Sequence, residues 1–400
     1  MNAYFIIIIA SSIVIISYFF NLISSSKNIP SILLLIALGI IAQIIVNTLG
    51  IQPIDIMKIL EILGIIGLIL IVLEAALDLE IKLNELSIIW KSFLIALISL
   101  TINVLAIGIL FYVFYQMKFI IALIYAVPLS IISSAIVIPS IFNLDSQKRE
   151  MMIYESTFSD ILGIMAFYFL LSSTDYQSFG EIGISITSNI FITILISILI
   201  SYVLIVVFQN LNIRTKLFLL VSVLLLFYSI GKLLHLSSLI IILIFGLIIN
   251  NRNLFFRGFL KRFLNEEKSK KVFEDFKLIT IESSFIVRTF FFVIFGFSIN
   301  FSSLLNFKVI FISILIFFFV FFFRYVILKI SLKRDIKPLI YIAPRGLITI
   351  LLFFSIPQEL VSKNFQDGIL FFIIISTCSI MAWNLIKNNK SQNLDTSKNG

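Results

Sequence analysis

Two carboxylates lie close together in an apolar stretch of this chain, at residues 155–160, which read Glu-Ser-Thr-Phe-Ser-Asp. Residues four apart share one side of a helix, so Glu155 lies over Ser159 and Ser156 lies over Asp160. An ionised group at the centre of a bilayer costs at least about 2.5 to 3.5 kcal/mol, so each one needs a partner or a function. A carboxylate held there can bind a proton or a cation, and this is the chemistry that the pair offers.

One arginine in another apolar run can neutralise one of the two carboxylates. Arg324 lies in the stretch Phe-Phe-Phe-Arg-Tyr, whose hydrocarbon surroundings argue for a carboxylate partner. We assign Glu155 to Arg324, because one buried cation fully neutralises only one carboxylate. Asp160 then carries the function, since competition between a proton and a cation for one site is itself an exchange mechanism.

Each of these three residues also has a purely structural interpretation. Asp160 can instead make a hydrogen bond between packed helices, or reach water at the cytoplasmic end of its helix. Glu155 and Arg324 can form a salt bridge with no role beyond structure, or Arg324 can tune Asp160. A further carboxylate, Glu74, either lies within its apolar run or faces water near the end of it.

The elements that hold these residues are predicted to be membrane helices. Hydrophobic residues make up 60% of the chain and charged residues 13%, with a mean hydropathy of +1.15. A soluble domain would have to hide more apolar surface than its core can hold. A helix crosses the hydrocarbon in about 20 residues, and this length predicts about thirteen transmembrane helices in an all-α integral membrane protein. The first apolar run, residues 3–23, is expected to be retained as a helix.

Composition also excludes several classes of site. The chain has one cysteine, Cys378, and one histidine, His235. Neither a disulfide framework nor a cysteine and histidine metal cage can be built from them, and we expect no cofactor. The net charge is +9, but the basic residues lie between apolar runs, where they mark cytoplasmic loops. We therefore expect no nucleic-acid partner.

The basic residues predict how the chain is oriented. They occur in alternate connections, at Lys27, Lys148 with Arg149, Arg214 with Lys216, and Lys333 with Arg334 and Lys337. Positive charge marks the cytoplasmic side, so the N-terminus is predicted outside and the C-terminus in the cytoplasm. The compartment is then the inner (plasma) membrane of a prokaryote. Residues 389–400 are polar and are predicted to be a short disordered cytoplasmic tail.

The connection at residues 250–277 is the longest and is strongly basic. It has an amphipathic pattern, in which apolar residues alternate with Arg and Lys: Leu254, Phe255, Phe259, Leu260, Phe263 and Leu264. Such a segment can lie on the inner leaflet of the membrane. The alternative is a solvated cytoplasmic helix between two bundles.

Two predicted spans, residues 119–142 and 339–357, are interrupted by polar residues or by residues that break helices. These are Ser133, Ser134 and Pro139 in the first span and Pro344, Arg345 and Gly346 in the second. The two spans occupy equivalent positions if the first six and the last six spans are inverted repeats. Paired interrupted helices of this kind point to a binding site at the midplane of a transporter.

The set of motifs resembles the monovalent cation:proton antiporter superfamily, which includes NhaP-type proteins and the animal sodium/proton exchangers. Residues 73–79 are similar to the family's Phe-Glu-Gly-Gly-Leu-x-Leu, and residues 155–160 to its Glu-Ser-x-x-Asn-Asp. Residues 291–296 resemble its Phe-Phe-x-x-x-Gly segment, and residues 343–347 its Pro-Arg-Gly turn. Arg324 stands where the family keeps a Lys or Arg. The likeness spans nearly the whole chain.

The resemblance implies roles for several residues. Asp160 would bind the monovalent cation and exchange the proton. Ser156, Glu74 and Ser159 would help to hold the ion, while Glu155 pairs with Arg324.

The resemblance also implies an architecture. Two interrupted helices would cross within a transmembrane antiporter domain, residues 1–388. A core around residues 90–172 and 308–386 would move as an elevator against a dimerisation bundle made of the remaining helices. The chain is therefore expected to form a homodimer in the lipid bilayer.

The expected function is exchange of a monovalent cation for protons by a secondary transporter, not an enzyme. Sodium is favoured, with potassium and lithium as alternatives. A symporter that couples an organic solute to protons or sodium stays open, because a midplane site serves either purpose. An integral-membrane transferase is a weaker alternative, since the predicted outer loops are too short to build its active site.

Overall fold

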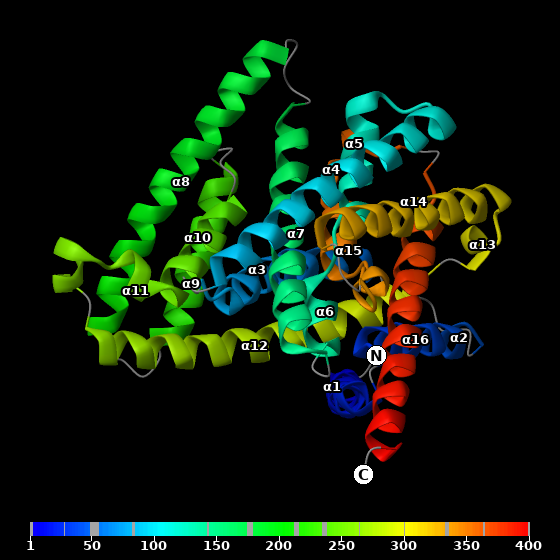
Figure 1. Ribbon diagram of the computed structural model, residues 1–400, viewed down its shortest axis with the longest axis horizontal. Helices are drawn as coiled ribbons and strands as arrows, with labels where there is room; N and C mark the ends of the chain where they lie inside the picture. Colours follow the sequence, from blue (N-terminus) through cyan, green and yellow to red (C-terminus); the bar gives the residue numbers. More distant parts are fainter. Residues whose placement is uncertain are drawn as a thin grey trace. The chain divides into compact units, whose positions relative to one another are not determined.

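The computed structural model describes residues 3–27, 29–48, 56–81, 85–141, 144–173, 179–211, 216–233, 238–263, 265–299, 301–332, 336–362 and 365–398 (Figure 1). All regular structure in these ranges is helical, so the predicted all-α class is confirmed. Eight helical segments among them are long and apolar enough to cross a membrane. The count of about thirteen spans and the inverted repeats stay predictions. His235, Arg214, Lys333 and Arg334 lie outside the described ranges.

The chain divides into two compact units. The first contains Met1–Ile65, Ile88–Gly163 and Ile286–Gly400, and the second contains Ile66–Ser87 and Ile164–Phe285. Helices that lie wholly or mainly in the first unit are α1 (Ala3–Lys27), α2 (Ser31–Thr48), α4 (Leu86–Tyr115), α5 (Phe119–Ser130), α6 (Ser134–Ser140), α13 (Phe301–Leu304), α14 (Phe307–Leu332), η4 (Leu339–Tyr341), α15 (Leu347–Phe354), η5 (Gln358–Leu360) and α16 (Gly368–Lys398).

The second unit holds the middle of the chain. Its helices are α8 (Phe179–Asn210), α9 (Lys216–Leu233), α10 (Ser238–Asn250), α11 (Arg252–Phe255) and η3 (Gly258–Phe263). Besides α4, whose first two residues fall in the second unit, three helices are divided between the units: α3 (Ile56–Asp78), α7 (Ser146–Ser172) and α12 (Glu266–Phe297).

Two helices of the first unit are broken, as the polar interruptions predict. The span at residues 119–142 consists of α5 and α6, separated by extended backbone at residues 131–133. The span at residues 339–357 consists of η4 and α15, with Pro344, Arg345 and Gly346 between them. Pro139 lies in the last turn of α6 rather than at the break.

The two breaks meet each other. The backbone N–H of Ser133 donates to the carbonyl of Pro344 over 3.0 Å. A Cβ atom at Gly346 would lie 2.9 Å from Ser133 Oγ and would overlap the side chain of Ile136. Glycine is therefore needed at position 346 because the second break approaches the first too closely for a side chain.

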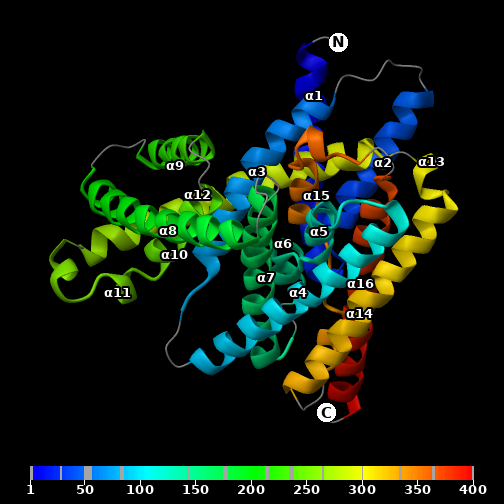
Figure 2. The same cartoon turned by 90° about the horizontal axis from the view of Figure 1, so that it is seen from above.

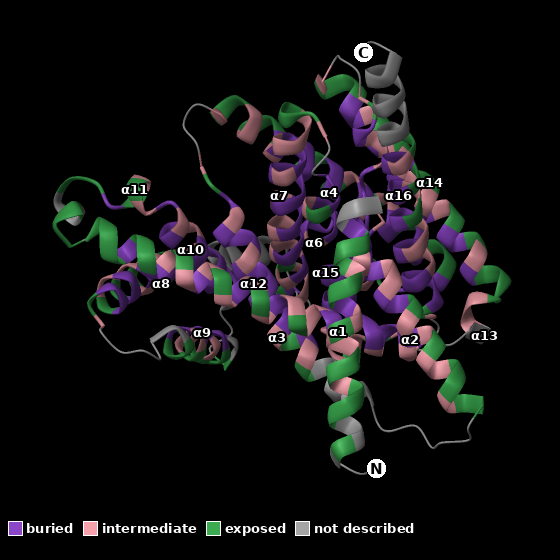
Figure 3. Ribbon diagram, turned by 90° about the horizontal axis from the view of Figure 1, so that it is seen from below, coloured by how far each residue is buried: buried purple, intermediate pink, exposed green. Residues whose placement is uncertain are grey.

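The surroundings of the breaks form the buried centre of the first unit. Figure 3 shows buried residues along α6 and α15, and every residue from Leu347 to Leu352 is buried. The helix α7 packs against the first break, because a Cβ atom at Gly163 would overlap the side chain of Ile131. Water has little access here, so polar groups at the breaks must be satisfied by the protein.

The helices α2 and α12 approach each other closely at two glycines of the first unit. A Cβ atom at Gly39 would overlap the carbonyl of Val293, and one at Gly296 would overlap the carbonyl of Ile36. Small residues allow such close backbone contact between membrane helices, where dispersion contacts stabilise the pair.

In the second unit, α8 and α10 lie side by side, and α10 packs closely on the end of α3 (Figure 2). A Cβ atom at Gly246 would lie 2.6 Å from the Cβ of Ala76. The Asn251 side chain donates to the Leu79 carbonyl over 2.9 Å and accepts from the Ile81 N–H over 2.6 Å. Asn251 thereby supplies partners to the backbone just beyond α3, where the helix leaves such groups unpaired.

The last helix, α16, is helical as far as Lys398. This range takes in most of residues 389–400, for which the polar composition predicts a disordered tail. The disorder of residues 389–400 stays a prediction.

Gly296→Ala is expected to lower thermal stability, by about 1 to 3 kcal/mol, because the added methyl group forces α2 and α12 apart. The unfolding midpoint of the purified protein in detergent would measure this loss. Gly64→Ala is the matched control, because its Cβ atom would lie 3.0 Å from the flexible end of the Leu351 side chain and at an ordinary 3.9 Å from the Phe291 ring, with no backbone atom in the way. Equal midpoints for the two variants would contradict the close contact.

Candidate functional site

The helix α7 carries both carboxylates into the buried centre of the first unit. Glu155 is 0% exposed and Asp160 is 1% exposed. Ser156, Thr157 and Ser159, which lie between them, are also buried. A polar stretch with so little exposure must be matched by donors and acceptors from the protein.

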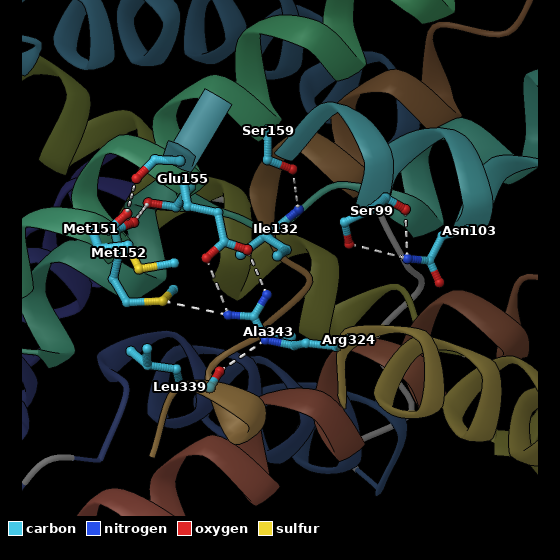
Figure 4. Close-up of polar contacts among 12 residues, drawn as sticks. Ser99, Asn103, Ile132, Met151, Met152, Glu155, Ser159, Arg324, Leu339 and Ala343 are labelled. Atoms are coloured by element: carbon cyan, nitrogen blue, oxygen red, sulfur yellow. Dashed lines mark hydrogen bonds and ion pairs between the residues drawn. The ribbon is translucent and has the colours of Figure 1, made fainter. Parts of the chain in front are cut away.

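Glu155 and Arg324, which we predicted to pair, form a buried ion pair (Figure 4). Arg324 Nη1 lies 2.6 Å from Glu155 Oε1, and Arg324 Nη2 lies 3.4 Å from Oε2. The remaining guanidinium contacts go to the Leu339 carbonyl over 2.8 Å and to Met152 Sδ over 3.4 Å. The guanidinium thus meets both carboxylate oxygens of Glu155, so this carboxylate is neutralised and fixed.

Asp160 lies at the break between α5 and α6. Its Oδ2 accepts hydrogen bonds from the backbone N–H of Ser134 over 3.0 Å and from the Ser134 hydroxyl. Its Oδ1 is buried and has no hydrogen-bond partner among the described residues. Both donors favour the ionised form of the carboxylate, whereas burial without a cationic partner opposes it. Such a group is suited to take up a proton or a cation.

The hydroxyl groups of Ser156, Thr157 and Ser159, next to these carboxylates, differ in their hydrogen bonding. Ser159 Oγ accepts from the backbone N–H of Ile132 over 2.9 Å, which fixes the first break against α7 (Figure 4). Ser156 Oγ donates to the carbonyl of Met152 over 2.8 Å, within its own helix. Thr157 Oγ1 is buried and has no partner in the part of the chain that the structure describes. That Ser156 and Ser159 help to hold an ion stays a prediction.

Arg345 fills the second break and is 1% exposed. Its guanidinium donates to three carbonyls: Leu129 over 2.9 Å, Ala343 over 2.7 Å and Ser130 over 3.3 Å. Leu129 and Ser130 are the last residues of α5, whose final carbonyls have no partner within the helix. A cation at the C-terminus of a helix also interacts favourably with its dipole. Arg345 therefore caps α5 from the other broken helix.

Glu74 belongs to the second unit, where its carboxylate accepts a hydrogen bond from Ser284 Oγ. One turn later in α3, Asp78 forms an ion pair with Lys277 over 2.8 Å. These two contacts hold the end of α3 against α12 in that unit. That Glu74 takes part in ion binding stays a prediction.

Two features of the site were not predicted from the sequence. Ser134 and Arg345 stood out only as residues that interrupt helices, whereas the structure gives Ser134 as the hydrogen-bond partner of Asp160 and Arg345 as the cap of α5. Both roles depend on how two helices distant in sequence are aligned, and residue spacing does not encode this. In the described residues, no group of three His, Cys, Asp or Glu side chains could hold a metal ion.

The chain is similar to known proteins both in sequence family and in fold. The family model "sodium/hydrogen exchanger, transmembrane" matches residues 8–385. A structure of the sodium proton antiporter MjNhaP1 from Methanocaldococcus jannaschii at pH 8 is similar, with a TM-score of 0.70 and 21% identity, covering 96% of this chain and 94% of that one. An electron-microscopy structure of MjNhaP1 has a TM-score of 0.68 and 20% identity, covering 98% and 97%.

At these identities the two structures establish the fold, which is that of NhaP-type antiporters. No curated protein matches the sequence.

Glu155→Gln is expected to destabilise the protein by about 3 to 5 kcal/mol, because it leaves the Arg324 charge buried without a counter-charge. Thermal unfolding in detergent would measure this loss. The double variant Glu155→Gln/Arg324→Gln should lose less than the sum of the two single variants, since the two residues interact directly. Glu150→Gln, on the same helix, is the control and should stay within about 0.5 kcal/mol of the wild type. Additive losses would contradict the pair.

Proposed function

The chain belongs to the sodium/hydrogen exchanger family, and we propose from this premise that it exchanges a monovalent cation for protons at Asp160. The observation that supports this role best is the contrast between two buried carboxylates on α7. Glu155 is neutralised by Arg324, whereas Asp160 accepts hydrogen bonds only from the two donors of Ser134 within the described part of the chain. One carboxylate is fixed by a permanent charge, and the other is left to exchange its partner.

Exchange follows from competition for one carboxylate. A cation and a proton each neutralise Asp160, so the binding of one requires the release of the other. The neutral, loaded site is less costly to move through the low-dielectric centre of the membrane than the empty, ionised site. This difference couples the two flows, because the empty site is held back on either side.

The broken helices support ion binding at this position. The break before α6 leaves the backbone N–H of Ser134 without a partner in its own helix, so this group can donate to Asp160. Ser134 presents its donors to Asp160, while Arg345 caps the carbonyls at the end of α5. The ion would be held by Asp160 with help from Ser156 and Ser159.

Sodium is the cation we favour, with potassium and lithium as alternatives. The description of the matched family and the names of the two similar structures refer to sodium. Elevator movement of a core around residues 90–172 and 308–386, and assembly as a homodimer, are proposed from the family resemblance. The lipid bilayer is the common environment of all these elements.

The chain is a multi-pass membrane protein. We propose the plasma membrane of a prokaryote as its location, with the N-terminus outside and the C-terminus in the cytoplasm. The distribution of Lys and Arg over alternate connections supports this orientation.

Asp160→Asn is expected to abolish cation-driven proton movement, because the amide can neither release a proton nor attract a cation. Proteoliposomes loaded with a pH-sensitive dye would report the exchange when sodium, lithium or potassium is added. Asp145→Asn, an exposed carboxylate before the start of α7, is the matched control and should retain full exchange.

Two outcomes of that experiment would overturn the proposal. One is exchange that persists in a correctly folded Asp160→Asn variant. The other is a folded wild type that responds to none of the three cations, which would favour symport of an organic solute.

Ser134→Ala is expected to raise the KM for the cation about tenfold and to lower kcat much less, since it removes a hydrogen bond to a charged group. The hydroxyl favours the ionised form of Asp160, to which the cation binds. Without it, protons compete more strongly. Cation titrations at several pH values would measure the change. Ser140→Ala is the control, because the Ser140 hydroxyl donates only to the Ile136 carbonyl of its own helix. An unchanged KM at every pH would contradict the role of Ser134.

A further inference from the structure

The basic connection between α10 and α12 is fixed in place within the second unit. The Tyr202 hydroxyl of α8 donates to the Phe255 carbonyl over 3.0 Å. Further along, the Gln209 side chain donates to the Phe263 carbonyl over 2.5 Å and accepts from the Asn265 N–H over 2.9 Å. The segment made of α11 and η3 is therefore attached to α8 at two points, at the end of α11 and at the end of η3.

These attachments place the segment at the boundary of the bilayer. The apolar stretch of α8 ends at Asn210, so Gln209 marks its polar end. Tyr202 lies seven residues earlier in α8, and seven residues of helix correspond to about 10 Å. The segment thus runs beside the last two turns of a membrane-crossing helix. A segment that lies in the interface reaches about 5 to 10 Å into the membrane, a comparable depth.

The side chains of this segment are sorted between an inner and an outer side. Phe256 is buried and packs edge-to-face on Tyr202, with ring centroids 4.8 Å apart. Arg257, Lys261 and Arg262 are exposed, and so is Phe263. The outer side therefore combines three cations with an aromatic ring. The side chains of Phe259 and Leu260 and the whole of Leu264 lie outside the described part of the chain.

The charge of this surface is not balanced within the segment. Residues 250–263 contain no acidic residue. Lys261 pairs with Glu266 over 3.7 Å, but both side chains are more than half exposed, so the pair is weak. For Arg257 and Arg262, the described residues provide no ion pair. The guanidinium group binds phosphate with two parallel hydrogen bonds, a geometry that lysine lacks.

We propose that the exposed surface formed by Arg257, Lys261, Arg262 and Phe263 binds the phosphate groups of anionic phospholipids. The two arginines and the lysine contact the headgroup phosphates, and the phenylalanine enters the upper part of the acyl chains. The sequence left two alternatives for residues 250–277, a segment on the inner leaflet and a solvated cytoplasmic helix. The proposal favours the segment on the inner leaflet. The inference depends on insertion in a bilayer and not on which ion is exchanged.

The test uses the full chain, purified in a zwitterionic detergent. Fluorescent phosphatidylglycerol and phosphatidylcholine would be titrated in mixed micelles, and the unfolding midpoint would be followed with each lipid. The wild type is expected to bind phosphatidylglycerol more tightly and to be stabilised by it. Because each surface Lys or Arg adds about 1 kcal/mol of attraction to an anionic membrane, the variant Arg257→Gln/Lys261→Gln/Arg262→Gln should lose at least about tenfold in affinity.

A second triple variant is the matched control. Lys268→Gln/Lys270→Gln/Lys271→Gln removes the same charge from the start of α12, where these exposed lysines are interspersed with Glu266, Glu267 and Glu274. It should keep most of the preference for phosphatidylglycerol. If the first triple variant does not fold, the single variant Arg262→Gln should still lose several-fold in affinity.

Three results would overturn the proposal. The first is an unchanged affinity for phosphatidylglycerol in the folded variant Arg257→Gln/Lys261→Gln/Arg262→Gln or in Arg262→Gln. The second is an equal loss of this affinity in both triple variants. The third is equal stabilisation by inorganic phosphate, which would identify a site for a free anion. The measurement needs no ion gradient, so its failure is distinct from a failure of antiport.

Discussion

The whole arrangement depends on one constraint, which is that charge in a membrane interior must be neutralised by the protein itself. Among the described residues, four charged side chains of the first unit are buried: Glu155, Asp160, Arg324 and Arg345. Two of them neutralise each other at 2.6 Å. Arg345 donates to backbone carbonyls, and one oxygen of Asp160 accepts from the two donors of Ser134. Asp160 is thus a buried carboxylate that makes no ion pair with the described residues, and this is the feature on which the proposed exchange rests.

The two broken helices are subject to the same constraint, because their unpaired backbone groups must also find partners within the protein. A break exposes backbone groups that a continuous helix would satisfy, and in a membrane each one is costly if left alone. Here each break supplies partners to the other, through the contact of Ser133 with Pro344 and through Arg345 at the end of α5. Ser159 then fixes the first break to α7, which carries Asp160. The side chains of Arg345 and Ser159, which hydrogen-bond to backbone groups at the ends of the broken helices, thus also fix the position of the site.

At the edge of the membrane a charged side chain does not need a partner within the protein, because water and lipid headgroups can interact with it. The connection formed by α11 and η3 exposes Arg257, Lys261 and Arg262 and turns Phe256 inward. Buried arginines of the first unit have partners in the chain, whereas on this surface Lys261 makes one exposed, weak ion pair and the described residues provide none for Arg257 and Arg262. Lipid phosphates are suited to that position, since they bring negative charge to the depth at which the segment lies.

The sequence by itself determined the fold class, the family and the identities of the charged residues. Apolar runs of membrane-spanning length are a local property, and an ionisable residue within such a run stands out wherever it lies. The rule that a buried cation neutralises one carboxylate predicted one partner for Arg324, and the family resemblance indicated that this partner is Glu155. Only the tertiary structure decided that Ser134 donates to Asp160, that Arg345 caps α5, and that Gln209 and Tyr202 hold the basic connection against α8. These contacts join residues on different helices, and their formation depends on register and close approach between helices, which the spacing of residues along one chain does not specify.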